Sequence, residues 1–528
     1  MQLDEKSNIV RAAGTVGFFT LGSRILGFIR DMVMAFFFGA SNVTDAFFVA
    51  FTIPNLLRRL FAEGTMTVSF VPVFTDYLTN RGEEEAHRVA AITMTALMLA
   101  LFVVVFLGIV FAPQINFIVA PGFKQDVDKW DLTVLLTRIM FPYIFFISLA
   151  ALAMGVLNSL RHFFAPAAAP MLLNIAMISA MYLISPFLSK PIVGLAYGVI
   201  IGGLLQLLFQ IPFLVRRGMI PRLDFNFSHP AVKTIVRLMV PAVFGASIYQ
   251  INIVVIRLLA SYLPEGSISY LYYADRLEQL PVGIFAVALG TAILPSMSKM
   301  AAQNRHDELK ETLVHSLSLT LYITLPATAG LIVLREPIFS LLFYRGEFDY
   351  QSVILSASAL LFFSIGLPAV SAVRVIANAF YAQKDTRTPV EIGVVSIIVN
   401  ILLSIILIIP MRQNGLALAV SLAACVNFFF LMFTFRVRMG RLGLKALLIS
   451  TAKISLGCLL LGASAWAIAS RFPWEVAGRN GEKALFLTLA IVTGISVYVV
   501  STRLMRSREL RDIINPFSEK LKKLRRRK

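Results

Sequence analysis

Charged residues are scarce in this chain: they account for 15% of its 528 residues, whereas hydrophobic residues account for 58% and the mean hydropathy is +0.79. Apolar runs of about 20 residues, long enough to cross a bilayer as a helix, recur from one end of the sequence to the other. This composition excludes a water-soluble globular protein. It predicts an all-α polytopic membrane protein.

Cysteine and histidine are also rare. The two cysteines, Cys425 and Cys458, both fall inside apolar segments, so neither a disulfide framework nor a thiolate metal site is predicted. No metal site is expected from histidine either, because none forms an i,i+4 pair with another: His87, His162, His229, His306 and His315. The sequence has no Walker loop, dinucleotide-binding fingerprint or nucleophile elbow, so it lacks the motifs that ATP hydrolysis and acyl transfer usually require.

Apolar windows separated by glycine, proline and charged residues predict about fourteen transmembrane helices. The first apolar run is too long and too charged for a cleavable signal peptide, so we expect it to remain as a helix. The predicted spans are 12–38, 43–78, 88–112, 131–158, 164–186, 191–215, 233–262, 268–298, 309–334, 350–381, 388–410, 414–436, 444–469 and 483–503.

Positive charge is in excess, with 48 Lys and Arg against 29 Asp and Glu. In a soluble chain this excess would suggest a nucleic-acid partner, but here most cations fall in short loops and in the C-terminal tail, so we expect none. The loops on the side of the N-terminus are the more basic, and the positive-inside rule therefore predicts both termini in the cytoplasm. The tail LKKLRRRK is typical of an anionic-lipid anchor or a stop signal.

An internal repeat appears at a spacing of about 220 residues. VSFVPVFTDYLTNRG at 68–82 aligns with TAILPSMSKMAAQNR at 291–305, and VGLAYGV at 193–199 aligns with NGLALAV at 414–420. Each repeat holds six predicted helices, an even number, so the two halves share one orientation and are related by an axis along the membrane normal. Binding sites in such folds lie near the midplane between the halves.

The repeat sets the predicted domain boundaries. Residues 1–218 form an N-terminal lobe of helices 1–6, and residues 219–440 form a C-terminal lobe of helices 7–12. Residues 441–505 add helices 13 and 14, and residues 506–528 form a basic cytoplasmic tail. The predicted architecture is two six-helix lobes plus two C-terminal helices.

Three charges interrupt the first apolar span, namely Arg24, Arg30 and Asp31. Each would cost about 2.5–3.5 kcal/mol at the membrane centre, so we expect them to face an internal wet cavity, and the cations favour an anionic ligand. Arg24 and Asp31 lie on one helical face, whereas Arg30 points about 120° away from Arg24. Gly27 leaves space on that face for a ligand group or for a second helix.

Two further spans carry clustered charges, whereas the single cations Arg138, Arg257, Arg374 and Lys453 are expected to snorkel or to form structural ion pairs. The second span contains Asp45, Arg58, Arg59 and Glu63. Arg59 and Glu63 are spaced i,i+4 and can form an ion pair, which leaves Arg58 as the cation more available to a ligand. The alternative is that Arg58 and Arg59 lie at the cytoplasmic end of the helix and snorkel.

The eighth span contains Asp275 and Arg276. Tyr272 and Gln279 flank Arg276 and can orient it by hydrogen bonds, although an interfacial tyrosine belt with a snorkelling arginine is the simpler alternative.

Several long motifs resemble the MurJ (MviN) family of lipid II flippases, within the multidrug/oligosaccharidyl-lipid/polysaccharide (MOP) exporter superfamily. The resemblance covers essentially the whole chain. It rests on SRILGFIRD, TDAFFVAFTIPNLLRRLFAEG, APGF at 120–123, FPYI at 141–144, YYADRLEQLPVGIFAVALGTAILPSMSK and DTRTP at 385–389. It implies a bacterial inner-membrane protein with fourteen helices in two lobes, and a groove for a lipid tail on helices 13 and 14.

The resemblance also implies a substrate and its site. The substrate is undecaprenyl-pyrophosphate-linked GlcNAc-MurNAc-pentapeptide, flipped to the periplasmic leaflet by alternating access for peptidoglycan biosynthesis. The implied substrate-binding residues are Arg24, Arg30, Asp31, Arg58, Glu63 and Arg276, and the supporting residues are Asp45, Arg59 and Asp275. No cofactor is expected, and coupling to the membrane potential or to a monovalent cation stays open. Besides lipid II, membrane lipids and cell-wall synthesis proteins are the expected partners.

Three alternatives compete with a flippase. A cation-coupled exporter of drugs, or of other lipid-linked saccharides, could use the same fold, but an exporter of cationic drugs predicts an acidic cavity where this sequence predicts a basic one. A membrane enzyme acting on polyprenyl phosphates needs clustered carboxylates or a His/Arg/Ser constellation, and neither is found in the sequence. A scaffold for cell-wall enzymes predicts that cavity charges are dispensable.

Overall fold

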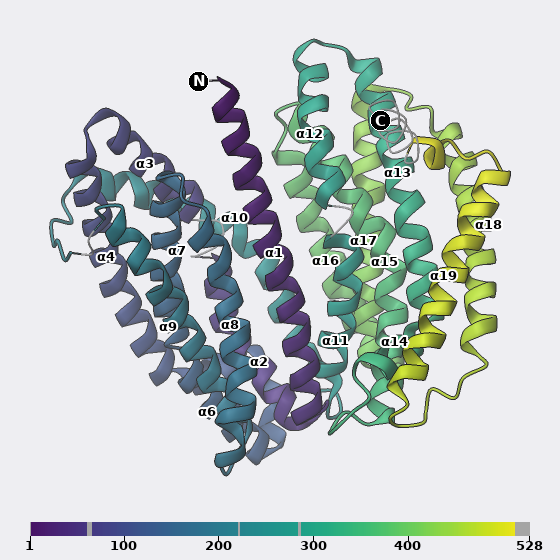
Figure 1. The fold of residues 1–528 in the computed structure, drawn as a ribbon, viewed down its shortest axis with the longest axis horizontal. Coiled ribbons are helices and arrows are strands. Elements are labelled where there is room, and N and C mark those ends of the chain that lie inside the picture. Colours follow the sequence, from purple (N-terminus) through teal and green to yellow (C-terminus); the bar gives the residue numbers. More distant parts are fainter. Residues whose placement is uncertain (1, 61–65, 220–221, 284–286, 513–528) are drawn as a thin grey trace, which may run out of the picture. The chain divides into compact units, whose positions relative to one another are not determined.

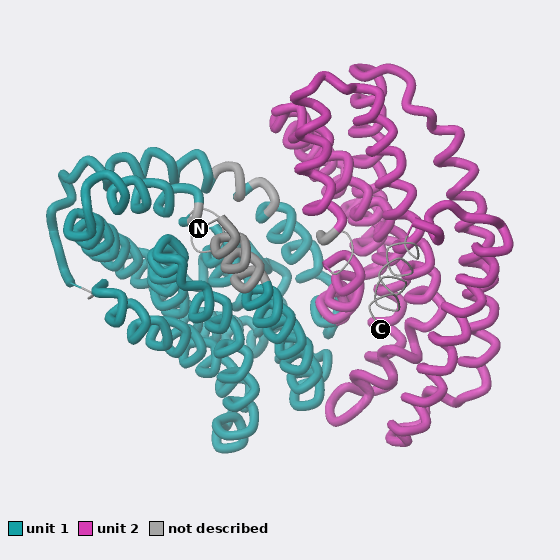
Figure 2. The backbone as a smooth tube through the Cα atoms, turned by 45° about the horizontal axis from the view of Figure 1, so that its top comes forward, with its two compact units in different colours: residues 1–269 teal, residues 270–528 magenta. Residues whose placement is uncertain are grey.

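A computed structural model describes residues 2–60, 66–219, 222–283 and 287–512. The described chain is built from helices and their connections, with one isolated bridge between Arg345 and Phe348 (Figure 1). It divides into two compact units, Met1–Ser269 and Tyr270–Lys528, which Figure 2 distinguishes by colour.

The described part of unit 1 holds ten α-helices and the start of an eleventh, besides two short 3₁₀ helices, Pro121–Gln125 and Ser185–Phe187. The α-helices are α1 (Gln2–Phe38), α2 (Asn42–Arg58), α3 (Met66–Asn80), α4 (Glu83–Val110), α5 (Ala112–Val119), α6 (Val127–Met140), α7 (Tyr143–Ser159), α8 (Phe164–Leu183), α9 (Ile192–Arg216), α10 (Pro230–Ala260) and the first turn of α11 (Ser267–Pro281). Short polar side chains mark some of the helix starts: Ser41 accepts a hydrogen bond from the backbone of Thr44, and Asp126 from that of Lys129.

Among its described residues, unit 2 contains the rest of α11 and eight further α-helices. They are α12 (Val287–Ala302), α13 (His306–Val333), α14 (Arg335–Leu342), α15 (Tyr350–Ala382), α16 (Arg387–Met411), α17 (Gln413–Met439), α18 (Leu444–Ala469) and α19 (Asn480–Leu504). The helices α15, α16 and α17 pack on one another, while α18 packs on α13 and α19.

Small residues let the helices of each unit approach closely. A Cβ atom on Gly198 of α9 would lie 2.7 Å from the Cβ of Ala180 on α8, and one on Gly366 of α15 would lie 2.6 Å from the Oγ of Ser421 on α17. Ser421 also donates a hydrogen bond to the carbonyl of Phe362 at 2.6 Å. Close approach through glycine and serine is how helices associate in a membrane, where apolar burial between them contributes little.

The internal repeat recurs in the helix lengths. The pair α4 and α13 are both 28 residues long, and α5 and α14 are both 8 residues long. The span Val127–Ser159, made of α6 and α7, has 33 residues, as has α15. The aligned prolines, Pro72 and Pro295, lie inside α3 and α12. The same succession of elements therefore occurs twice, as the sequence repeat predicts.

The all-helical, membrane-spanning class is confirmed. Among the described residues, ten helical stretches are long and apolar enough to cross a membrane. The other four predicted spans correspond to α1, to α2 with α3, to α10, and to α11 with α12. The count of fourteen is consistent with this arrangement. The domain boundaries at 218 and 440 stay predictions; α10, assigned by the repeat to the second lobe, packs against α3 in unit 1.

Asp385 of the DTRTP motif fixes the start of α16. Its carboxylate accepts hydrogen bonds from the backbone of Arg387 at 3.1 Å and from the backbone and hydroxyl of Thr388 at 3.0 and 2.7 Å. Arg438, at the end of α17, pairs with the same carboxylate. Burial opposes ionisation of Asp385, but the hydrogen bonds from Thr388 and Arg438 outweigh it and lower the pKa to about 2.

Candidate functional site

A buried charge cluster joins α1 to α8. Arg30, 8% exposed, donates to Oδ1 of Asp31 at 3.0 and 2.6 Å and to Oδ1 of Asn174 on α8 at 3.0 Å. Asn174 in turn donates to the carbonyl of Ser23 at 3.1 Å. The same amide lies 3.7 Å from where a Cβ on Gly27 would stand, so the space predicted beside that glycine admits a second helix. The guanidinium of Arg30 is therefore held by an acid and an amide.

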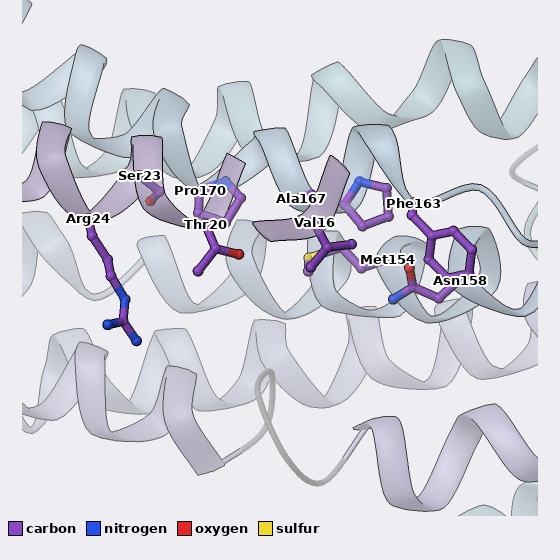
Figure 3. A pocket seen from close by; sticks show the side chains of 10 residues that line it. Val16, Thr20, Ser23, Arg24, Met154, Asn158, Phe163, Ala167 and Pro170 are labelled. Carbon is purple, nitrogen blue, oxygen red and sulfur yellow. The ribbon is translucent and has the colours of Figure 1, made fainter. Parts of the chain in front are cut away.

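Arg24 stands in a different setting, at one end of a pocket between α1, α7 and α8. The pocket has a volume of about 530 Å³, and Figure 3 shows Arg24 and Asn158 toward its opposite ends. Its lining is mostly apolar: Val16, Thr20, Ser23, Arg24, Met154, Asn158, Phe163, Pro166, Ala167 and Pro170. The side chain of Arg24 is exposed, in contrast to that of Arg30. An exposed guanidinium beside an apolar wall suits an amphipathic anion.

Asp45 belongs to a second buried network, on α2. Its carboxylate accepts from Nζ of Lys129 at 3.3 Å, from the backbone of Gly266 at 2.9 Å, and from the backbone and hydroxyl of Ser269 at 2.9 and 2.7 Å. Lys129 is also buried and donates to Oδ1 of Asn42 at 2.7 Å. Asp45 therefore caps the first turn of α11 within unit 1.

Of the remaining charges of the second span, Arg58 and Arg59 are half-buried. Arg58 donates from Nε to Oδ1 of Asn55 at 3.1 Å. Arg59 follows at the end of α2. Glu63, the predicted partner of Arg59, lies outside the described residues.

Arg276 lies in unit 2, on α11. It donates from Nε and Nη2 to the hydroxyl of Tyr272 at 3.1 and 2.9 Å, so the predicted tyrosine contact is confirmed. The contact predicted for Gln279 is wrong: its amide donates to Oδ2 of Asp275 at 2.5 Å. Gln279 stands at i+4 from Asp275, where a carboxylate can accept a hydrogen bond from its amide N–H.

Two residues that hold the predicted charges were missed from the sequence. Asn174 is a neutral amide in the apolar run MLLNIAM. Lys129 lies in VDKWD beside two acids, a pattern typical of a solvent-exposed helix N-terminus. Their partners, Arg30 and Asp45, are distant in sequence. An isolated amide inside an apolar span was the one available signal for Asn174, because a polar group there needs a partner.

No group of three or more His, Cys, Asp or Glu side chains suited to a metal ion is found among the residues that the structure describes.

Comparisons with known proteins agree with one another. A family model described as "Lipid II flippase MurJ" matches residues 34–478. A Burkholderia cenocepacia protein named "Lipid II flippase MurJ" is 40% identical over 82% of this chain and 84% of its own, and a Vibrio cholerae protein named "Probable lipid II flippase MurJ" is 35% identical over 96% and 97%.

Solved structures give the same result. One of a lipid II flippase MurJ in an inward closed conformation superposes with a TM-score of 0.79 at 28% identity, covering 94% of this chain and 99% of that one. An inward-facing MATE-family multidrug transporter of the MOP superfamily reaches a TM-score of 0.67 at 15% identity, covering 80% and 95%, and shares the fold alone.

Proposed function

This chain belongs to the MurJ family of lipid II flippases, and we propose that it carries lipid II across the bacterial inner membrane. The family is one of transporters and not of enzymes. The proposed substrate is undecaprenyl-pyrophosphate-linked GlcNAc-MurNAc-pentapeptide. It moves from the cytoplasmic to the periplasmic leaflet, where it serves peptidoglycan biosynthesis and so cell-wall growth.

The observation that carries this proposal is the setting of Arg24. A pyrophosphate and a sugar-peptide headgroup cannot cross hydrocarbon unaided, because their charges and polar groups lose their hydration. A guanidinium binds phosphate oxygens through a bidentate fork, and more strongly where water is excluded. The exposed Arg24 at one end of the pocket, with Thr20, Ser23 and Asn158 as the other polar residues of the wall, supplies such a fork.

In this proposal, Arg30 is a second cation for the pyrophosphate, and Asp31 pairs with it until the substrate arrives. An unpaired guanidinium inside a membrane is costly, so Asp31 and Asn174 hold Arg30 while no substrate is bound. A pyrophosphate that approaches competes with these neutral and acidic acceptors for the guanidinium. Substrate entry is thereby coupled to a change in the contact between α1 and α8.

The other predicted charges also have proposed roles. Arg276, oriented by Tyr272, is the proposed cation of the second lobe, with Asp275 supporting it. Arg58 and Glu63 are proposed to act at the inward-facing entrance, with Arg59 beside them. Rocking of the two lobes then alternates access while the polyprenyl tail stays in the bilayer, along α18 and α19.

The inside-negative membrane potential is one proposed source of energy. Moving one anionic charge outward through the full potential releases about 2.3 kcal/mol per 100 mV, and a pyrophosphate carries at least one such charge. Coupling to a monovalent cation is the other proposal. In both, the termini are cytoplasmic, which the basic tail and loops support. Cell-wall synthesis proteins are proposed partners through the family resemblance.

A cation-coupled exporter is the second candidate, and it has weaker support. The fold likeness to MATE transporters, at 15% identity, says nothing of substrate. A pocket for organic cations needs acidic groups, and none of the ten described residues that line this pocket is acidic.

Depletion of the protein in its host tests the proposal. We expect lipid II accessible at the outer leaflet to fall when the chain is depleted, and to return when the wild-type chain is supplied. Unchanged outer-leaflet lipid II after depletion would refute the flippase function.

A further inference from the structure

From the last turn of α19 to the end of the described chain, exposed arginines alternate with buried residues. Arg503, Arg506, Arg508 and Arg511 are all exposed. Between them, Ser507, Glu509 and Leu510 are buried, with exposed fractions of 4%, 6% and 6%. The burial of Glu509 needs a cause, because an acid beside arginines in a free segment would stay in water, as the exposed Asp512 does.

The hydrogen-bond partners of Glu509 supply that cause. Its Oε1 accepts hydrogen bonds from the hydroxyls of Ser318 on α13, at 2.8 Å, and Ser450 on α18, at 2.5 Å. Its Oε2 accepts from the hydroxyl of Ser507 at 2.6 Å. The ammonium of Lys453 on α18 also donates to the carbonyl of Met505 at 3.1 Å. The hydroxyls of Ser318 and Ser450 therefore clamp the segment to two transmembrane helices, and that of Ser507 satisfies the other oxygen of the same carboxylate.

The clamp places the arginines beside further cations and an apolar surface. Since α18 and α19 are packed antiparallel through a short connection, the start of α18 lies at the same end as Arg503, which brings the exposed Arg441 and Lys445 to that end (Figure 1). Immediately beneath, large apolar side chains face outward, with exposed fractions of 68% for Leu448 and 78% for Leu504.

We propose that this C-terminal arginine patch, formed by Arg503, Arg506, Arg508, Arg511, Arg441 and Lys445, binds the headgroups of anionic glycerophospholipids, and that Glu509 is the positioning residue that presents it. The cations meet a phosphate, and the apolar surface below them meets acyl chains, so the pair of surfaces fits one amphipathic anion. An acidic soluble protein would match the charge alone. This proposal goes beyond lipid II transport and does not depend on it.

Lipid selectivity of the full chain tests the proposal. The protein is reconstituted in phosphatidylcholine vesicles, and the immobilised fraction of spin-labelled phosphatidylglycerol is compared with that of spin-labelled phosphatidylcholine. The double variant Arg506→Gln with Arg511→Gln should lower the preference for phosphatidylglycerol by about fivefold or more. The matched double variant Arg471→Gln with Arg479→Gln, at the other end of α18 and α19, should leave it unchanged. High salt should lower the wild-type preference.

Glu509→Ala gives a test whose sign separates a clamp from diffuse charge. Removing an acid makes the region more positive, so diffuse attraction predicts a stronger preference for phosphatidylglycerol. The clamp predicts a weaker preference, because the arginines lose their fixed position. A stronger preference in Glu509→Ala would overturn the positioning role. An unchanged preference in the arginine variant, an equal loss in the control, or displacement of phosphatidylglycerol by equimolar undecaprenyl phosphate would overturn the lipid site.

Discussion

Replacing Lys129 by methionine should destabilise the protein strongly, because it leaves a buried carboxylate without its cation. Asp45 is 1% exposed, and Lys129 is 8% exposed. Removing one partner of a buried ion pair costs about 3–5 kcal/mol. Asp45 keeps three donors, from Gly266 and Ser269, which still satisfy part of its hydrogen bonding. We therefore expect a loss near the lower limit, about 3 kcal/mol in the free energy of unfolding.

The measurement is reversible unfolding of the purified protein in mixed micelles. Lys124→Met is the matched control: Lys124 is exposed and near Lys129 in sequence, and its replacement should change the free energy of unfolding by less than about 1 kcal/mol. Combining Lys129→Met with Asp45→Asn should cost about 1–3 kcal/mol less than the sum of the single variants. A Lys129→Met variant as stable as the control, or strict additivity in the double variant, would refute the buried ion pair.

Two further predictions concern single polar contacts. Asn174→Leu removes an acceptor from the buried Arg30 and should lower the free energy of unfolding by about 1.5–3 kcal/mol. Asn158→Leu, at an exposed position, should leave it nearly unchanged. Equal melting temperatures for the two variants would contradict this prediction. The fold holds the pKa of Asp385 at about 2, below its ordinary value of 3.8, so the ionised carboxylate stabilises the fold fully at pH values above that ordinary value. That contribution should be constant near neutral pH and disappear as the pH falls toward 2. The difference in stability between wild type and Asp385→Asn, followed from pH 7 to pH 2.5, checks the sign; a difference that grew on acidification would contradict it.

The sequence predicts the helices well because the conditions for spanning a membrane can be judged from each segment of the chain alone. A spanning segment needs about 20 apolar residues with its backbone satisfied internally, and both conditions are visible in the chain itself. The span predicted at 350–381 is α15, Tyr350–Ala382, and that predicted at 444–469 is α18, Leu444–Ala469. The hydrogen bond from Arg276 to Tyr272 was predictable for the same reason, since an i−4 neighbour on a helix is always close.

The partners of the buried charges were not predictable in this way. Asn174 meets Arg30 across two helices, and Lys129 meets Asp45 through the packing of α6 on α2. Neither contact joins residues at a helical spacing, so no pattern in the sequence predicts it. Helical geometry placed Arg24 and Arg30 on different faces, and the structure gives these two arginines different settings, one in an open pocket and one in a buried pair. Whether both bind pyrophosphate stays a prediction.

Translocation of fluorescent lipid II by the purified protein in vesicles, with Arg24 altered, tests the central claim most directly. Arg24→Gln should abolish translocation, and Arg24→Lys should retain part of it, because an ammonium keeps the charge but loses the bidentate fork. Arg471→Gln, at an exposed site on the connection between α18 and α19, should translocate lipid II as the wild type does. Full translocation by Arg24→Gln would contradict the claim that this arginine carries the pyrophosphate.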